Sequence, residues 1–174
     1  MKTLNGYLAR EIGARNGIRW QRFLSRRVRR ILPASILTLL VTAVVYAAVA
    51  TPLEQADAFG GFRSAFFFVA NWHFIQQSTD YFAASVDTNP VLHFWSLAVE
   101  EQFYVVWPGL VALVTLGARD RIRARVGTAM AVVVAVSFLA SGLLTAGQPS
   151  WSYFGLHTRA WELGAGALLA GVLR

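Results

Sequence analysis

The sequence contains no cysteine and few charged residues. None of its 174 residues is Cys, which excludes disulfides, thiolate catalysis and cysteine-based metal sites. Charged side chains make up 14% of the chain, whereas an average soluble domain has about 25%. Hydrophobic residues make up 56%, and the mean hydropathy is +0.48. A chain of this size cannot hide that much apolar surface in one core, so the composition indicates a membrane protein and argues against a soluble enzyme or a disordered tail.

Acidic residues are also scarce. The chain has 9 Asp and Glu against 16 Lys and Arg, which gives a net charge of +7 and a pI near 10.8. Most arginines form two clusters, each beside a long apolar run: Arg19, Arg22, Arg26, Arg27, Arg29 and Arg30, and then Arg119, Arg121, Arg123 and Arg125. Such clusters mark the cytoplasmic side of a membrane protein, so we expect membrane lipid as a partner and no nucleic acid.

The hydropathy pattern predicts an all-α, polytopic membrane helix bundle with about four spanning helices and one short re-entrant or interfacial helix. The short helix is expected at 64–75, which is apolar but only about half a membrane long. We expect one partial domain over 1–174, divided into a cytoplasmic basic segment (1–30), spans (31–53, 90–117, 126–146 and a truncated 159–174), extracytoplasmic segments (54–89 and 147–158) and a cytoplasmic basic loop (118–125).

Prolines and capping residues predict where two of these spans begin. Pro33 falls in the expected first turn of the first span, where a missing N–H costs little. Pro90 suits the first turn of the second span, with Thr88 or Asn89 as its N-cap.

Ionisable residues inside the second span are candidates for a site, because a charge at mid-bilayer costs at least about 2.5–3.5 kcal/mol. At 100° per residue, one narrow helical stripe contains His93, Glu100, Tyr104 and Trp107, and Glu101 flanks it. The carboxylates could support a reaction, or they could pair with arginines and only hold helices together. His93 could instead lie at the membrane interface, at the N-terminal end of this helix.

Two further groups of charged residues have alternative interpretations. Arg159 and Glu162 could form a local pair, or each could reach another helix. The run of Arg26, Arg27, Arg29 and Arg30 could set topology and contact anionic lipid, or bind a phosphorylated cytosolic ligand. Asn71, Trp72 and His73 resemble a polar turn after an apolar helix, which alone indicates little about function.

Three stretches together resemble the acyltransferase 3 family of integral-membrane O-acyltransferases. Residues 26–33 read RRVRRILP, residues 92–104 read LHFWSLAVEEQFY with Trp107 and Pro108 following, and residues 158–164 read TRAWELG. The order and spacing also fit the family, as do Asn71 and Trp72 followed by DYF at 80–82. Family members have about ten spanning helices and a histidine on the first of them. This chain resembles an internal fragment that lacks that first helix and the C-terminal helices.

The resemblance implies transfer of an acyl group, usually acetyl from cytosolic acyl-CoA, to a hydroxyl of an extracytoplasmic sugar, in the bacterial inner membrane. It implies no bound cofactor and no metal; acyl-CoA and a glycan are the implied partners. Either arginine pair, 26 with 29 or 27 with 30, fits the family's donor-binding element. The resemblance gives supporting catalytic roles to His93, Glu100, Glu101, Arg159 and Glu162, and substrate contacts to Asn71, Trp72 and Tyr104 as well as the arginine run. The oligomeric state is not predicted.

Two other readings compete with the enzyme. A transporter segment would use intramembrane Glu and His to line a path, and inverted repeats would favour it, although none is visible here. A small structural or partner-binding membrane protein is the other alternative. In either non-enzyme case, the long match at 95–104 would need to be a relic.

Overall fold

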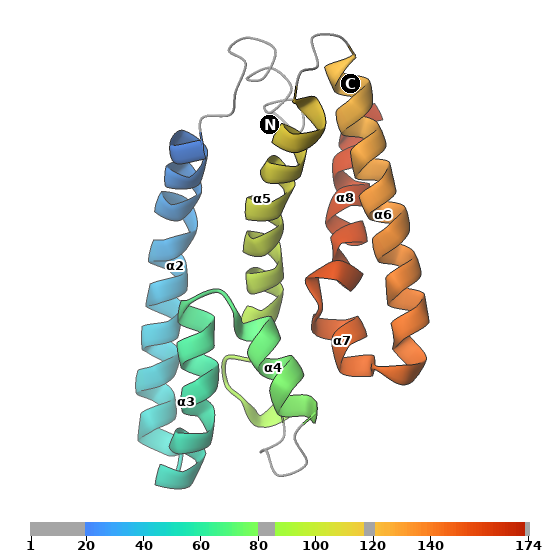
Figure 1. The fold of residues 1–174 in the computed structure, drawn as a ribbon. Coiled ribbons are helices and arrows are strands. Elements are labelled where there is room, and N and C mark those ends of the chain that lie inside the picture. The colour runs from blue at the N-terminus through green and yellow to red at the C-terminus, as the bar shows by residue number, and fades with distance from the viewer. Residues whose placement is uncertain (1–19, 80–85, 117–120, 173–174) are drawn as a thin grey trace. The chain divides into compact units, whose positions relative to one another are not determined.

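The computed structural model describes residues 20–79, 86–116 and 121–172, which are helical with short turns and include no strand (Figure 1). Three described helices are long and apolar enough to cross a membrane: Leu24–Val49, Phe94–Thr115 and Ile122–Gly147. The prediction of an all-α membrane bundle is therefore confirmed. The chain divides into two compact units, one of residues 21–101 and the other including 102–174, and each is described by itself.

The first unit begins with α2 (Trp20–Val49), which differs from the expected first span at both ends. The arginine run is part of the helix, since arginine is a good helix former. Pro33 therefore lies inside α2, and the prediction that it occupies the first turn is wrong. A proline at this position removes one backbone hydrogen bond without ending the helix.

Helix α3 (Pro52–Phe66) follows α2 almost at once because a capping box fixes its start. The Thr51 side chain accepts a hydrogen bond from the backbone N–H of Glu54, and the Glu54 carboxylate accepts one from the Thr51 N–H at 2.7 Å. Pro52 takes the first helical position, where its missing N–H is harmless. Because Thr51, Pro52 and Glu54 begin a new helix, α2 ends at Val49, four residues before the expected end of the first span.

The segment expected as one short apolar helix at 64–75 is divided between two helices, α3 and α4 (Ala70–Thr79). The break lies at Phe68, whose φ of 56° is in the left-handed region. Two glycines of α3 allow close contacts, one with α4 and one with the turn at Asn89. A Cβ on Gly60 would come within 2.7 Å of the His73 ring, and a Cβ on Gly61 within 2.4 Å of the Asn89 amide.

Helix α5 (Phe94–Thr115) begins four residues later than expected. After the 3-10 helix η1 (Val86–Thr88), Asn89 Oδ1 accepts a hydrogen bond from the Val91 N–H at 3.2 Å. The Asn89 side chain therefore stabilises a turn rather than capping the helix. Residues 94–101 of α5 belong to the first unit, and the rest belong to the second.

The second unit packs α5 with α6 (Ile122–Gly147) and α8 (Leu156–Val172). Its buried core consists of Phe103, Trp107, Val111, Val126, Met130 and Ala160. Gly164 lets α8 approach α6 closely, because a Cβ there would be 2.6 Å from Val134. The expected loop at 147–158 contains a short helix, α7 (Pro149–Phe154). A fourth span at 159–174 remains a prediction.

Candidate functional site

An ion-pair cluster in the first unit joins α2 to the start of α5. Arg27 Nη2 donates a hydrogen bond to Glu101 Oε1 at 3.0 Å, and it lies 3.7 Å from Glu100 Oε1. The structure thus brings one arginine of the run close to both carboxylates of the second span. In the sequence, this arginine is more than 70 residues away from either carboxylate.

The helical position of Arg27 explains why this arginine forms the cluster. It lies on the less exposed stripe of α2, in line with Leu24, Ile31, Ser35 and Leu39. The other three arginines of the run lie on the exposed surface of the helix: Arg26, Arg29 and Arg30.

Burial makes the contact with Glu101 the stronger one. The side chains of Arg27 and Glu101 are about one-fifth exposed, at 21% and 20%, whereas Glu100 is 42% exposed. Partial removal from water strengthens the attraction between opposite charges, and it makes loss of either partner costly. Glu100 therefore keeps an accessible carboxylate beside an ion pair that holds α2 and α5 together.

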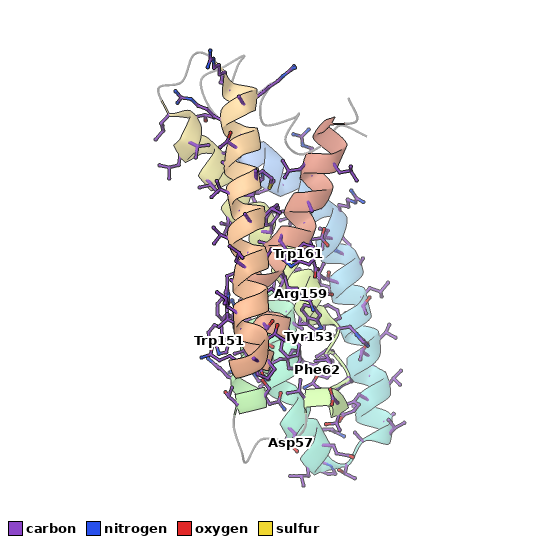
Figure 2. The ribbon with its side chains drawn as sticks, turned by 90° about the vertical axis from the view of Figure 1, so that its right-hand side faces the viewer. Asp57, Phe62, Trp151, Tyr153, Arg159 and Trp161 are labelled. Carbon is purple, nitrogen blue, oxygen red and sulfur yellow. The ribbon has the colours of Figure 1, made fainter. Side chains whose placement is uncertain are left out.

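A second charged cluster lies at the elbow between α7 and α8, in the second unit. Arg159 Nη1 pairs with the Glu162 carboxylate one turn along α8, so the local pairing of these residues is observed. Arg159 Nε also donates to the Tyr153 carbonyl at 3.0 Å, and the guanidinium lies 5.0 Å from the centre of the Tyr153 ring. Figure 2 shows Arg159 and Tyr153 next to each other at this elbow.

Buried hydroxyls fix the shape of this elbow. Thr158 Oγ1 donates to the carbonyls of Gly155 at 2.9 Å and Trp151 at 3.1 Å. Ser137 Oγ on α6 accepts a hydrogen bond from the Trp161 N–H at 3.0 Å. Because these bonds tie α7 and α8 to each other and to α6, Arg159 is held in one place while Tyr153 and Glu162 stay partly exposed.

The structure separates other predicted site residues from these clusters. His93 lies in the turn before α5 and is exposed, so it is not on a helical stripe with Glu100. Trp107 is a core residue with 1% of its surface exposed. Tyr104 is half-buried, and its ring meets the ring of Phe103 edge to face.

Asn71 and Trp72 are the second and third residues of α4 rather than a turn after a helix. Asn71 is fully buried, whereas Trp72 is 40% exposed. The motif at 80–82 lies outside the described residues, as do residues 1–19.

His73 is a titratable residue to which the sequence pattern assigned no role. Burial against α3, and secondly the charge of Arg63, lower the pKa of this imidazole below its ordinary value of 6.5. Its Nε2 atom is buried and has no hydrogen-bond partner among the described residues. The Gly60–Gly61 pair was a possible signal, since adjacent glycines in a helix suggest that another group packs closely against them.

Comparison with known proteins gives relatives over nearly the whole chain. Peptidoglycan O-acetyltransferase OatA of Listeria monocytogenes is 30% identical over 180 residues, which cover 98% of this chain and 28% of that protein. A Bacillus subtilis protein with the provisional name peptidoglycan O-acetyltransferase YrhL is 34% identical, with 97% and 27% covered. A provisionally named O-acetyltransferase of Staphylococcus aureus strain COL is 35% identical, with 88% and 25% covered.

The chain spans about a quarter of the length of these relatives. No solved structure gives a significant match. The family model described as an acyltransferase domain matches residues 3–173, which is almost all of the sequence. This chain therefore belongs to the acyltransferase 3 family.

Proposed function

We propose that the chain is part of a bacterial inner-membrane O-acyltransferase that transfers acetyl from acetyl-CoA to a hydroxyl of an extracytoplasmic sugar. Lipopolysaccharide, peptidoglycan and exopolysaccharide are the candidate acceptors. Family membership and relatives named for peptidoglycan O-acetylation support the reaction type. The structural observation that supports it most is the Arg27–Glu101 ion pair, because it joins the arginine run to the motif at 92–104.

In this reaction the sugar oxygen bonds to the acyl carbonyl carbon, and the bond from that carbon to the thioester sulfur breaks. The hydroxyl proton passes to a general base, and CoA leaves as its thiol. The family resemblance assigns the base to a histidine on the family's first helix, and it gives the residues named in this chain supporting roles. We therefore propose that these residues bind, orient and stabilise charge.

We assign donor binding to Arg26 and Arg29, whose spacing fits the family element and whose side chains are exposed. Guanidinium groups match the oxygens of phosphates, which CoA carries. Arg27 is partly neutralised by Glu101, so we treat these two as positioning residues that hold the run beside α5.

We assign acceptor binding to the elbow of α7 and α8. The exposed edge of the Glu162 carboxylate can accept hydrogen bonds from sugar hydroxyls, and the exposed Tyr153 ring offers an apolar surface beside it. Arg159 is held by both and would stabilise a developing oxyanion at this position.

The test is transfer of radiolabelled acetyl from acetyl-CoA to envelope glycan, in membranes that carry the chain with its flanking reading frame. We expect Arg26→Gln/Arg29→Gln to raise the KM for acetyl-CoA by about tenfold or more, the effect of losing a charged hydrogen bond, with a smaller change in kcat. Arg27→Gln should mainly lower kcat, and Arg27→Lys should restore part of it.

The matched control is Val44→Ala on the exposed surface of α2, which should leave both constants unchanged. Membranes in which the intact protein transfers no more acetyl than membranes without it would overturn the proposed reaction. An unchanged KM in the double variant, with transfer intact, would overturn the donor assignment alone.

A further inference from the structure

A shallow hollow that is widely open to the surroundings lies in the second unit, where α5 ends and α6 begins, with basic and apolar residues along it. Its volume is about 550 Å³, and six residues line it: Val114, Arg121, Ala124, Arg125, Thr128 and Ala129. Figure 1 shows the end of α5 and the start of α6 at the same end of this unit. The hollow is distant from the elbow of α7 and α8, which lies at the other end of α6.

The lining residues divide into a basic and polar side and an apolar side. Arg125 and Thr128 are one helical turn apart on α6, and Arg121 precedes the helix with a φ of 56°. Val114 on α5 and Ala129 on α6 provide apolar surface. Such a hollow suits a ligand with both a charged group and a hydrocarbon part.

The described residues that line this hollow include two arginines and no acid, and Asp120, which precedes Arg121 in the sequence, lies outside the described residues. Within the described part of the chain, neither Arg121 nor Arg125 forms an ion pair, and residues 121–129 contain three arginines and no acid. Arg123 provides a comparison, because it is also exposed but lies on roughly the opposite side of α6 and does not line the hollow.

We propose that this hollow binds the phosphate headgroup of an anionic membrane lipid. Arg121 and Arg125 would bind the phosphate oxygens, and the apolar wall of Val114 and Ala129 would contact the start of the acyl chains. General attraction between basic residues and a membrane surface requires charge alone. A bound headgroup also requires the two arginines to share one hollow, so the position of each arginine should matter.

The test compares three variants with the same change in charge. The chain is purified in detergent, and its affinity for fluorescent phosphatidylglycerol is measured beside phosphatidylcholine. We expect preference for phosphatidylglycerol, and Arg121→Gln and Arg125→Gln should each weaken it about fivefold. Arg123→Gln should weaken it less than twofold. Ala124→Trp, which fills the hollow with all charges kept, should weaken it as strongly as loss of an arginine.

Three results would overturn the proposal. The first is equal affinity for the two lipids. The second is an equal loss in all three arginine variants with no effect of Ala124→Trp, which would indicate a general surface charge. The third is displacement of the lipid by millimolar pyrophosphate with the same dependence on Arg121 and Arg125, because the apolar wall would then contribute nothing and the source of the phosphate would be a soluble compound.

Discussion

Arg27 illustrates how one residue's place on a helix determines its chemistry. Four arginines follow each other closely at 26–30, but only Arg27 lies on the less exposed stripe of α2, and it pairs with Glu101 at 3.0 Å. Its neighbours Arg26, Arg29 and Arg30 stay exposed. A similar contrast separates Glu101 from Glu100, which are adjacent but differ twofold in exposure.

Removing either partner of this pair should destabilise the protein, because the remaining charge stays partly buried. This pair is neither fully exposed nor fully buried, so its contribution should lie between those of surface and buried salt bridges. We expect Arg27→Gln and Glu101→Gln each to lower the free energy of unfolding by about 1–3 kcal/mol. The double variant should cost less than the sum, since the contact between Arg27 and Glu101 can be lost only once. Unfolding by denaturing detergent would measure these free energies.

Arg30→Gln is the matched control, because Arg30 belongs to the same run and is exposed. It should change the unfolding free energy by less than about 0.5 kcal/mol. Additive losses for Arg27 and Glu101, each no larger than that of Arg30→Gln, would show that the pair does not stabilise the fold.

His73 should make the first unit less stable in mild acid. Burial, and then Arg63, lower the pKa of the folded imidazole, so below the ordinary value of 6.5 the unfolded chain binds more protons than the folded one. Stability should therefore fall as pH decreases from about 6.5 toward the lower folded pKa. Thermal unfolding between pH 7 and 5 should show this loss, and His73→Gln should reduce it. An equal loss in the variant would contradict the assignment.

At the scale of elements, the sequence predicts the helices better than their ends. Long apolar runs identify α2, α5 and α6 because a spanning helix needs such a run. The boundaries depend on local hydrogen bonds that compete with the helix. The Thr51–Glu54 capping box is readable from the sequence, whereas the turn made by Asn89 and the left-handed Phe68 are not. Asn89 looks like an N-cap, and its preference for the turn becomes visible only in the folded chain.

Helix packing in the second unit depends on Gly164. A methyl group there would lie 2.6 Å from Val134 on α6, which is far inside normal contact, whereas a methyl group at Gly166 would meet nothing. We expect Gly164→Ala to lower the unfolding midpoint, because α6 and α8 must move apart. Gly166→Ala should leave it unchanged or raise it slightly, since Ala favours a helix over Gly by about 1 kcal/mol. Equal midpoints for the two variants would refute this packing role.

For the whole molecule, the sequence identifies residues of both charged clusters, but it predicts the pairing within only one of them. The local Arg159–Glu162 pair follows from a spacing of three along a helix. The pairing of Arg27 with Glu101 joins segments 74 residues apart, and no local rule selects Arg27 over Arg26. A stripe that joins His93 to Glu100 requires a helix that begins near residue 90, and α5 begins only at Phe94, after His93.

The predicted topology can be tested directly, because the chain has no cysteine of its own. Arg123 and Gln148 are exposed residues near opposite ends of α6. In intact cells, a membrane-impermeant maleimide should label Gln148→Cys and should label Arg123→Cys only after permeabilisation. The reverse pattern would invert the assignment of the basic clusters to the cytoplasm.

The most direct test of the proposed function is acetyl transfer by the intact protein and by a single variant of the ion pair. Membranes with the flanking reading frame would receive radiolabelled acetyl-CoA, and label in the envelope glycan would be counted for the wild type and for Glu101→Gln at equal protein level. We predict clear transfer by the wild type and a loss of at least about tenfold in the variant, the effect of misplacing a positioned group. No transfer by the wild type, or equal transfer by both proteins, would contradict a role for the pair in an O-acyltransferase.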